Sequence, residues 1–200
     1  MARTIVHLGM VPLVRIPELT RTHVQVLLDG GIEILVLPDV RGADQAAEFV
    51  RLGKYPPLGQ RGVCSSSANF NYHLRDPQQD FTAANSATRL MVMIESDEGY
   101  DALDATLDVE GVDMVTVGAA DWAADSGLYG DAAKSHLAPK IEHVVKASAA
   151  AGRMTAMGVF DVDNVARSRN LGVRIIFVGV DVNLQRDMLT DTLGRFRNAH

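Results

Sequence analysis

The chain has 200 residues, a formal net charge of -6, 47% hydrophobic residues and one cysteine. Such a composition is typical of a globular protein, and we expect residues 1–200 to form one domain. The mild acidic balance argues against nucleic acid or an anionic membrane surface as a partner, and no apolar run is long enough to cross a bilayer. A single cysteine cannot form an internal disulfide, which predicts a cytoplasmic protein.

Short apolar runs alternate with amphipathic stretches along the chain. They predict strands at 11–16, 32–38, 90–94, 114–118, 155–159 and 174–179, and helices at 20–29, 42–52, 98–107, 138–151, 162–170 and 182–196. About six β-α units of this kind build either an open doubly wound sheet or a closed (β/α)8 barrel. The turn at 15–18 lacks the glycines of a dinucleotide-binding fold, so the barrel is favoured.

The stretch 54–85 interrupts this alternation and reads as a long irregular segment. Long loops in compact domains usually serve a function, so we expect this one to lie over the mouth of the barrel as a lid or specificity loop. Phe70, Tyr72 and His73 lie within it. The two aromatic residues, together with Trp122, are candidates for an apolar wall of the pocket, although core packing explains Trp122 equally well.

Two acidic residues follow the ends of neighbouring predicted strands. Glu95 comes directly after the run 90–94, and Asp121 follows the run 114–118. Parallel α/β folds bind ligands at the carboxyl ends of their strands. Two carboxylates with open coordination positions suit Mg²⁺ or Mn²⁺. An acid after a strand is also a common helix N-cap, which by itself would explain Asp121.

Arg15 stands at the end of the first predicted strand and so at the same edge. A metal at this edge would have positions for the carboxylate and the keto oxygen of an α-keto acid, and it would act as a Lewis acid on the enolate. A fixed guanidinium nearby would stabilise the enolate oxygen. An isolated arginine is more often a structural ion-pair residue, but its coincidence with Glu95 and Asp121 favours a site.

Several segments follow one another in a characteristic order. They are VRIP at 14–17, LLDGG at 27–31, YPPLGQRG at 55–62, IE at 94–95, VEGVD at 109–113 and GAADW at 118–122. This series resembles the HpcH/HpaI aldolase family, the metal-dependent hydroxy-oxo-acid aldolases related to the citrate lyase β-subunit. The resemblance covers nearly the whole chain, and the ordered set is more specific than any single motif.

The resemblance implies a TIM (β/α)8 barrel and a class II aldolase. Such an enzyme forms or cleaves a C–C bond of a 4-hydroxy-2-oxo acid through a pyruvate enolate, with an aldehyde as the other product. It also implies a homo-oligomer, a trimer or hexamer with exchanged C-terminal helices, and a cofactor such as Mg²⁺, Mn²⁺ or Co²⁺. Matched residues are Glu95 and Asp121 as metal ligands, Arg15 beside the enolate, and the backbone of Gly118, Ala119 and Ala120 at the substrate carboxylate.

The chain departs from the family pattern in three places. The family's first two β-α units, with an acid–His pair that transfers protons, are absent, and residues 1–9 look like the tail of the following helix. We therefore expect a shortened version of a longer product, or partner chains that cover the gap. Met93 stands where the family usually has Gln, and GAADW at 118–122 replaces Gly-Pro-Ala-Asp-Leu, which suggests an altered pocket.

The absent His leaves proton transfer unassigned. His73, in the long loop, is the only candidate to replace it, because general-base work needs a group within about 3 Å of the proton. Two alternatives to the aldolase remain open. One is an oxaloacetate-type decarboxylase, which passes through the same enolate. The other is a noncatalytic barrel fragment that binds a metal or a keto acid.

Overall fold

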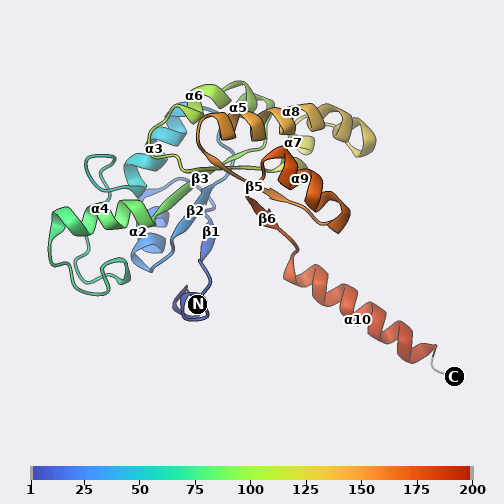
Figure 1. The fold of residues 1–200 in the computed structure, drawn as a ribbon, viewed down its shortest axis with the longest axis horizontal. Coiled ribbons are helices and arrows are strands. Elements are labelled where there is room, and N and C mark those ends of the chain that lie inside the picture. Colours follow the sequence, from blue (N-terminus) through green and yellow to red (C-terminus); the bar gives the residue numbers. More distant parts are fainter. Residues whose placement is uncertain (1, 199–200) are drawn as a thin grey trace.

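The computed structural model describes residues 2–198, and its centre is one curled parallel sheet (Figure 1). The strands are β1 (Leu13–Arg15), β2 (Ile34–Leu37), β3 (Arg89–Ile94), β4 (Met114–Val117), β5 (Met154–Gly158) and β6 (Ile175–Phe177). Each strand pairs with the next one along the chain, so the sheet order is β1-β2-β3-β4-β5-β6. A doubly wound sheet reverses its order at a switch point. This sheet does not, and it forms part of a TIM-like barrel, as predicted.

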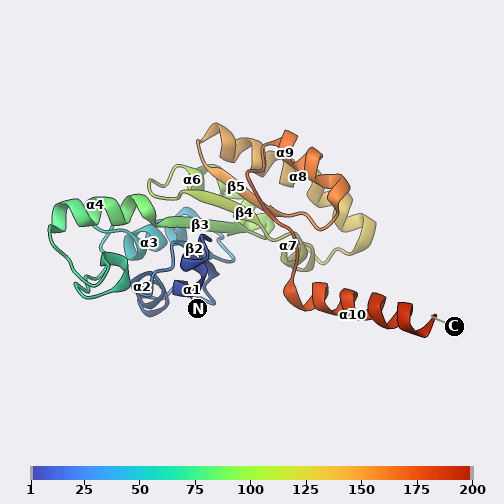
Figure 2. The ribbon, with the colours of Figure 1, turned by 60° about the horizontal axis from the view of Figure 1, so that its bottom comes forward.

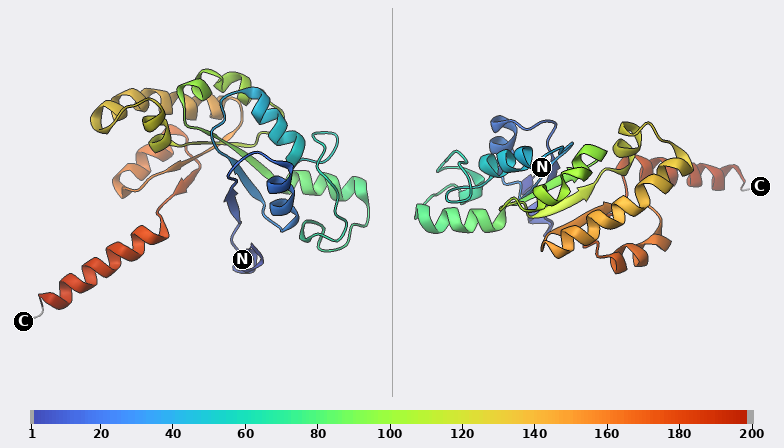
Figure 3. Two further views of the ribbon diagram at one scale, coloured as in Figure 1. Left: turned by 180° about the vertical axis from the view of Figure 1, so that it is seen from behind. Right: turned by 90° about the horizontal axis from the view of Figure 1, so that it is seen from above.

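Helices follow the strands and gather on one side of the sheet, where α3, α6 and α8 lie side by side (Figure 3). They are α1 (Ala2–His7), α2 (Arg21–Asp29), α3 (Ala43–Gly53), α4 (Pro77–Ala87), α5 (Asp97–Asp101), α6 (Leu103–Leu107), α7 (Ala119–Asp125), α8 (Gly130–Ala150), α9 (Val165–Leu171) and α10 (Asp181–Arg197), with 3-10 turns η1 (Ala68–Phe70) and η2 (Val162–Asn164). Among residues 2–198, no helix combines the length and hydropathy of a membrane span.

Most predicted elements are present, with three differences. Helix α4 lies inside the stretch expected to be irregular, and α7 was not predicted. Helix α8 begins two turns before the predicted start and continues through Pro139. The start of α4 has a sequence signal: the carboxylate of Asp76 accepts hydrogen bonds from the N–H groups of Gln78 and Gln79, and Pro77 occupies the first helical position.

Both faces of the sheet are apolar, which explains why its strands read as unbroken hydrophobic runs. In β3, Leu90, Val92 and Ile94 pack in the cluster beneath the helices. Met91 belongs to a second cluster on the inner face, against which Met93 packs. The sheet therefore carries β3 through the core and ends it at Glu95.

Helix α10 differs from the other long helices because it extends away from the sheet (Figures 1 and 2). None of its residues is buried. Several of its exposed side chains are large and apolar, namely Leu184, Met188, Leu189, Leu193 and Phe196. An apolar surface of this kind normally packs against another surface.

Candidate active site

Glu95 is the residue that follows β3, and its side chain is almost completely buried, with 7% of its surface exposed. The backbone N–H of Asp39, in the loop after β2, donates a hydrogen bond of 2.7 Å to its Oε1. Its Oε2 lies against Gly118, at the end of β4, where a Cβ would overlap it. That Oε2 is buried, and no N–H or O–H group among residues 2–198 donates a hydrogen bond to it. A buried carboxylate oxygen without a partner is costly, and metal sites are among the places where it occurs.

Asp121 and Arg15 both lie close enough to Glu95 to affect its ionisation. Burial raises the pKa of Glu95, and the hydrogen bond from Asp39 lowers it. The charge of Asp121 and the close approach of its carboxyl group raise the pKa of Glu95 further, and the positive charge of Arg15 lowers it. Both partners are exposed, Arg15 at the end of β1 and Asp121 in the first turn of α7. The three predicted residues thus lie together at the carboxyl edge of the sheet.

The donor set at this edge fits a hard divalent cation. Glu95 and Asp121 offer carboxylate oxygens, the ligands that Mg²⁺ and Mn²⁺ prefer. Within residues 2–198, no cluster of three or more His, Cys, Asp or Glu side chains is arranged to hold a metal. An ion held by two carboxylates would take its other ligands from water or substrate, which leaves open positions for chemistry.

A cavity of about 400 Å³ opens beside Asp121. Most of its lining side chains are apolar: Met93, Val117, Ala119, Ala120, Ile141, Met157, Phe160 and Phe177, with Thr116, Gly118 and Gly158. The backbone of 118–121, where α7 begins, therefore faces an apolar space. Met93, one of the residues that depart from the family pattern, is part of this lining.

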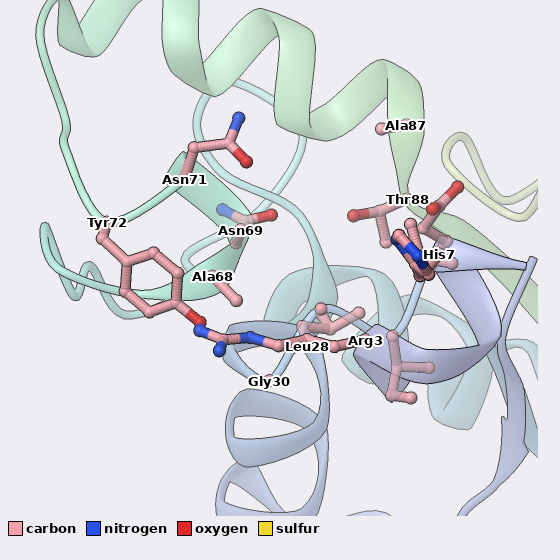
Figure 4. Close-up of a pocket in the computed structure, with 14 residues that line it drawn as sticks. Arg3, His7, Leu28, Gly30, Ala68, Asn69, Asn71, Tyr72, Ala87 and Thr88 are labelled. Carbon is pink, nitrogen blue, oxygen red and sulfur yellow. The ribbon is translucent and has the colours of Figure 1, made fainter. Parts of the chain in front are cut away.

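The loop that was predicted to cover the barrel mouth lies at the opposite edge of the sheet. Helix α3 starts at the carboxyl edge and runs back, so the chain that follows it emerges at the amino edge, beside α4 (Figure 2). Tyr72 lines a cavity of about 430 Å³ there, together with Asn69 and with Thr88, which precedes β3 (Figure 4). The prediction of a lid is therefore wrong.

The other two loop residues are also remote from the carboxyl edge. Phe70 packs against Tyr55 and Phe81, with ring centroids 5.6 and 6.1 Å away. His73 is exposed in the same segment, next to Tyr72. Its segment lies at the amino edge of the sheet and Glu95 at the carboxyl edge, so the structure does not support His73 as the group that transfers protons.

Trp122 is a core residue and does not form a wall of the pocket. Its side chain is fully buried, and its Nε1 donates a hydrogen bond of 2.7 Å to Asp97 Oδ1. Its ring packs 5.6 Å from that of Tyr100. The sequence left two interpretations of Trp122 open, a pocket wall and core packing. The structure shows core packing.

Sequence reasoning missed the loop that follows β2. Asp39 supplies the only hydrogen bond that the described residues donate to the Glu95 carboxylate, and its backbone is in the left-handed region, with φ of 48°. Arg41 contacts Asp39 from two residues further on. The signal was available, because charged residues directly after a parallel strand lie at the ligand-binding edge.

Comparisons with known proteins identify the family of the chain. The HpcH/HpaI aldolase/citrate lyase family matches residues 2–187. A hydroxypyruvate/pyruvate aldolase of Roseovarius nubinhibens is 35% identical over 186 residues, which cover 93% of this chain and 72% of that protein. A 2-keto-3-deoxy-L-rhamnonate aldolase of Salmonella gallinarum is 34% identical over 190 residues, which cover 94% of this chain and 70% of that protein.

A solved structure of a family member has the same fold as this chain. The crystal structure of an HpcH/HpaI aldolase from Desulfitobacterium hafniense has a TM-score of 0.91 and 28% identity, and the match covers 100% of this chain and 77% of that one. The named relatives are aldolases, which are carbon–carbon lyases. The chain therefore belongs to the HpcH/HpaI aldolase/citrate lyase family, as its sequence predicted.

Proposed function

We propose that this protein is a class II aldolase that forms or cleaves a C–C bond of a 4-hydroxy-2-oxo acid, releasing pyruvate and an aldehyde. The observation that carries the proposal is the buried Glu95 carboxylate, whose Oε2 accepts no hydrogen bond from the described residues and whose pKa is shifted by Asp121 and Arg15. Family membership supports this chemistry, and the two named relatives act at pyruvate-type and 2-keto acids.

Glu95 and Asp121 would hold the divalent metal that members of this family use. Mg²⁺ or Mn²⁺ suits two carboxylates best, and Co²⁺ is a further candidate. When bound, the ion supplies a Lewis acid for a pyruvate-type keto acid. The choice between these ions depends on availability as much as on the oxygen ligands themselves.

The chain's own residues would bind and polarise the keto acid. Arg15 would place a permanent positive charge beside the oxygen that becomes negative in the enolate, and removal of one such group typically costs about 3–4 kcal/mol of barrier. The substrate carboxylate would lie against the backbone N–H groups of Ala119 and Ala120, which open α7 just after Gly118. The first N–H groups of a helix have no partner within the helix and favour anions.

Decarboxylation of an oxaloacetate-type acid is the second candidate. It passes through the same enolate and needs less proton transfer. One observation favours it: no histidine in the described part of the chain donates to, or accepts from, Glu95 or Asp121. Release of CO₂ from oxaloacetate, measured beside the cleavage of hydroxy-oxo acids, distinguishes the two.

Self-association through α10 is the third part of the proposal. Its apolar side chains, such as Met188, Leu193 and Phe196, have exposed fractions of 68%, 53% and 78%. A trimer or hexamer that exchanges this helix would bury them. Light scattering on the full chain tests it, since a stable monomer with α10 exposed would contradict it.

Exchange of the pyruvate methyl protons with solvent tests the aldolase directly. In D₂O with Mg²⁺ and pyruvate, the protein should incorporate deuterium into the methyl group, because that exchange requires the enolate. Glu95→Gln should abolish the exchange. An unaltered protein that shows no exchange with Mg²⁺, Mn²⁺ or Co²⁺ would overturn the proposal and favour a noncatalytic keto-acid-binding barrel.

A further inference from the structure

Arg41 connects three segments at the carboxyl edge of the sheet. Its Nε donates to Asp39 Oδ1 at 2.8 Å, its Nη1 to Glu98 Oε2 at 3.3 Å and its Nη2 to Asp125 Oδ1 at 3.0 Å. These carboxylates belong to the loop after β2, to α5 and to α7. Within residues 2–198, no other arginine donates to the carboxylates of three separate segments.

The first of these contacts reaches Glu95 through the backbone of Asp39. The Asp39 N–H is the donor to Glu95 Oε1, and it points there because Asp39 adopts a left-handed backbone with φ of 48°. A non-glycine residue in this region is strained and persists only when its surroundings hold it. The bond from Arg41 to the Asp39 carboxylate is one of the contacts that hold it.

The second contact reaches Asp121 through α7. Asp125 lies four positions after Asp121 in that helix, so the two side chains share one face. Helix α7 is short, and its first residue follows Gly118 directly. A bond from Arg41 to Asp125 therefore fixes the far end of the element that carries Asp121.

We propose that Arg41 is a positioning residue that sets the distance between the carboxylates of Glu95 and Asp121. It does so by holding the Asp39 N–H against Glu95 and the α7 helix beside it. The three nitrogens of a planar guanidinium can each donate to a different carboxylate in a fixed geometry, whereas all the donors of an ammonium share one nitrogen. The predicted effect of Arg41 on metal affinity rests on the proposed function. Its predicted effect on the hydrogen bond from Asp39 to Glu95 does not.

Arg41→Met removes the guanidinium group and its three hydrogen bonds to carboxylates, and Arg51→Met is the matched control. Arg51 is comparably exposed, 46% against 37%, and donates to the Glu48 carboxylate on α3, with no contact to Glu95 or Asp121. Amide hydrogen exchange of the Asp39 N–H, followed by NMR on metal-free protein, is the first measurement. Protection should fall at least about tenfold in Arg41→Met and stay unchanged in Arg51→Met. Unchanged protection in Arg41→Met overturns the proposal.

The dissociation constant for Mn²⁺, measured by EPR of the free ion, is the second measurement. Removing a group that orients a metal ligand typically weakens binding about 10–100-fold, and we expect that range for Arg41→Met and no change for Arg51→Met. Arg41→Lys should recover only part of the affinity. If Arg41→Lys recovered the full Mn²⁺ affinity, a positive charge alone would suffice, and the proposed role of the guanidinium geometry would be overturned.

The two measurements separate failure of this inference from failure of the proposed function. Unaltered protein that binds no Mn²⁺ contradicts the metal site, while exchange at Asp39 still decides what Arg41 does. If Arg41→Met does not fold, Asp125→Ala removes only the contact between Arg41 and α7. That variant should weaken Mn²⁺ binding and keep the Asp39 N–H protected, and unchanged Mn²⁺ affinity in Asp125→Ala would contradict the α7 part of the proposal.

Discussion

Gly118→Ala tests whether the position of the Glu95 carboxylate matters. An added methyl group at residue 118 would lie 2.9 Å from Glu95 Cβ and would overlap Oε2, whereas ordinary contacts begin at 3.4 Å. The Gly118 backbone, with φ of -95°, accepts alanine without strain. The substitution therefore acts through the side chain that it displaces, by about 0.5 Å at Cβ and by more at the carboxylate.

The size of the effect follows from this displacement. Misplacing a reacting or binding group by about 1 Å can cost about 100-fold in rate, so we expect the rate of pyruvate methyl exchange to fall about 10- to 100-fold. That range corresponds to about 1.4–2.7 kcal/mol of barrier. Overpacking should also lower the free energy of unfolding by about 1–3 kcal/mol.

Deuterium incorporation into pyruvate, followed by proton NMR at saturating Mg²⁺, measures the rate, and urea denaturation measures the stability. Gly194→Ala is the control, because its methyl group meets no atom within 4 Å in α10. It should keep the exchange rate and should not destabilise the protein, since alanine favours a helix over glycine. A folded Gly118→Ala that exchanges the methyl protons at the wild-type rate would refute the placement of Glu95 in the site.

Two further predictions concern buried charges. Burial and the charge of Asp121 raise the pKa of Glu95, so ionised Glu95 destabilises the metal-free protein above that pKa, and Glu95→Gln should raise the urea midpoint at neutral pH. The gain should disappear as the pH falls below the raised pKa; an equal gain at low pH would contradict this explanation. Lys54, 2% exposed and 3.1 Å from Asp113, forms a buried pair, so Lys54→Met should cost about 3–5 kcal/mol of unfolding free energy. The exposed Lys146→Met should cost less than about 1 kcal/mol, and equal midpoints for the two lysine variants would contradict the role of burial.

The residues of the candidate site could be located from the sequence because each lies at, or shortly after, the end of a strand. In a parallel sheet the residue after an apolar run is carried to the carboxyl edge, whatever the helices do. Glu95 and Arg15 needed only the ends of their strands to be located. Asp121 needed the strand end at 118 as well, although the helix that holds it was not foreseen.

The loop was misplaced because one helix within it was overlooked. With α4 unrecognised, residues 54–85 read as one long segment free to reach the barrel mouth. A helix after a strand returns the chain to the amino edge, so everything between α3 and β3 belongs there. Asp76 and Pro77 marked the start of α4. Side-chain pairings such as Trp122 with Asp97 have no comparable signal, because they depend on how α5 and α7 pack.

Glu95 also shows why a structural role explains this site poorly. A buried carboxylate oxygen retained for stability would be expected to accept hydrogen bonds, as the Oδ2 of Asp113 does from Lys54 Nζ and from the N–H of Leu90. Glu95 has one bond from Asp39, a second oxygen that is buried without a partner, and a like charge nearby. The buried oxygen without a partner and the like charge both destabilise the metal-free fold and favour binding of a cation, so the arrangement is one that a bound ion would convert from unfavourable to favourable.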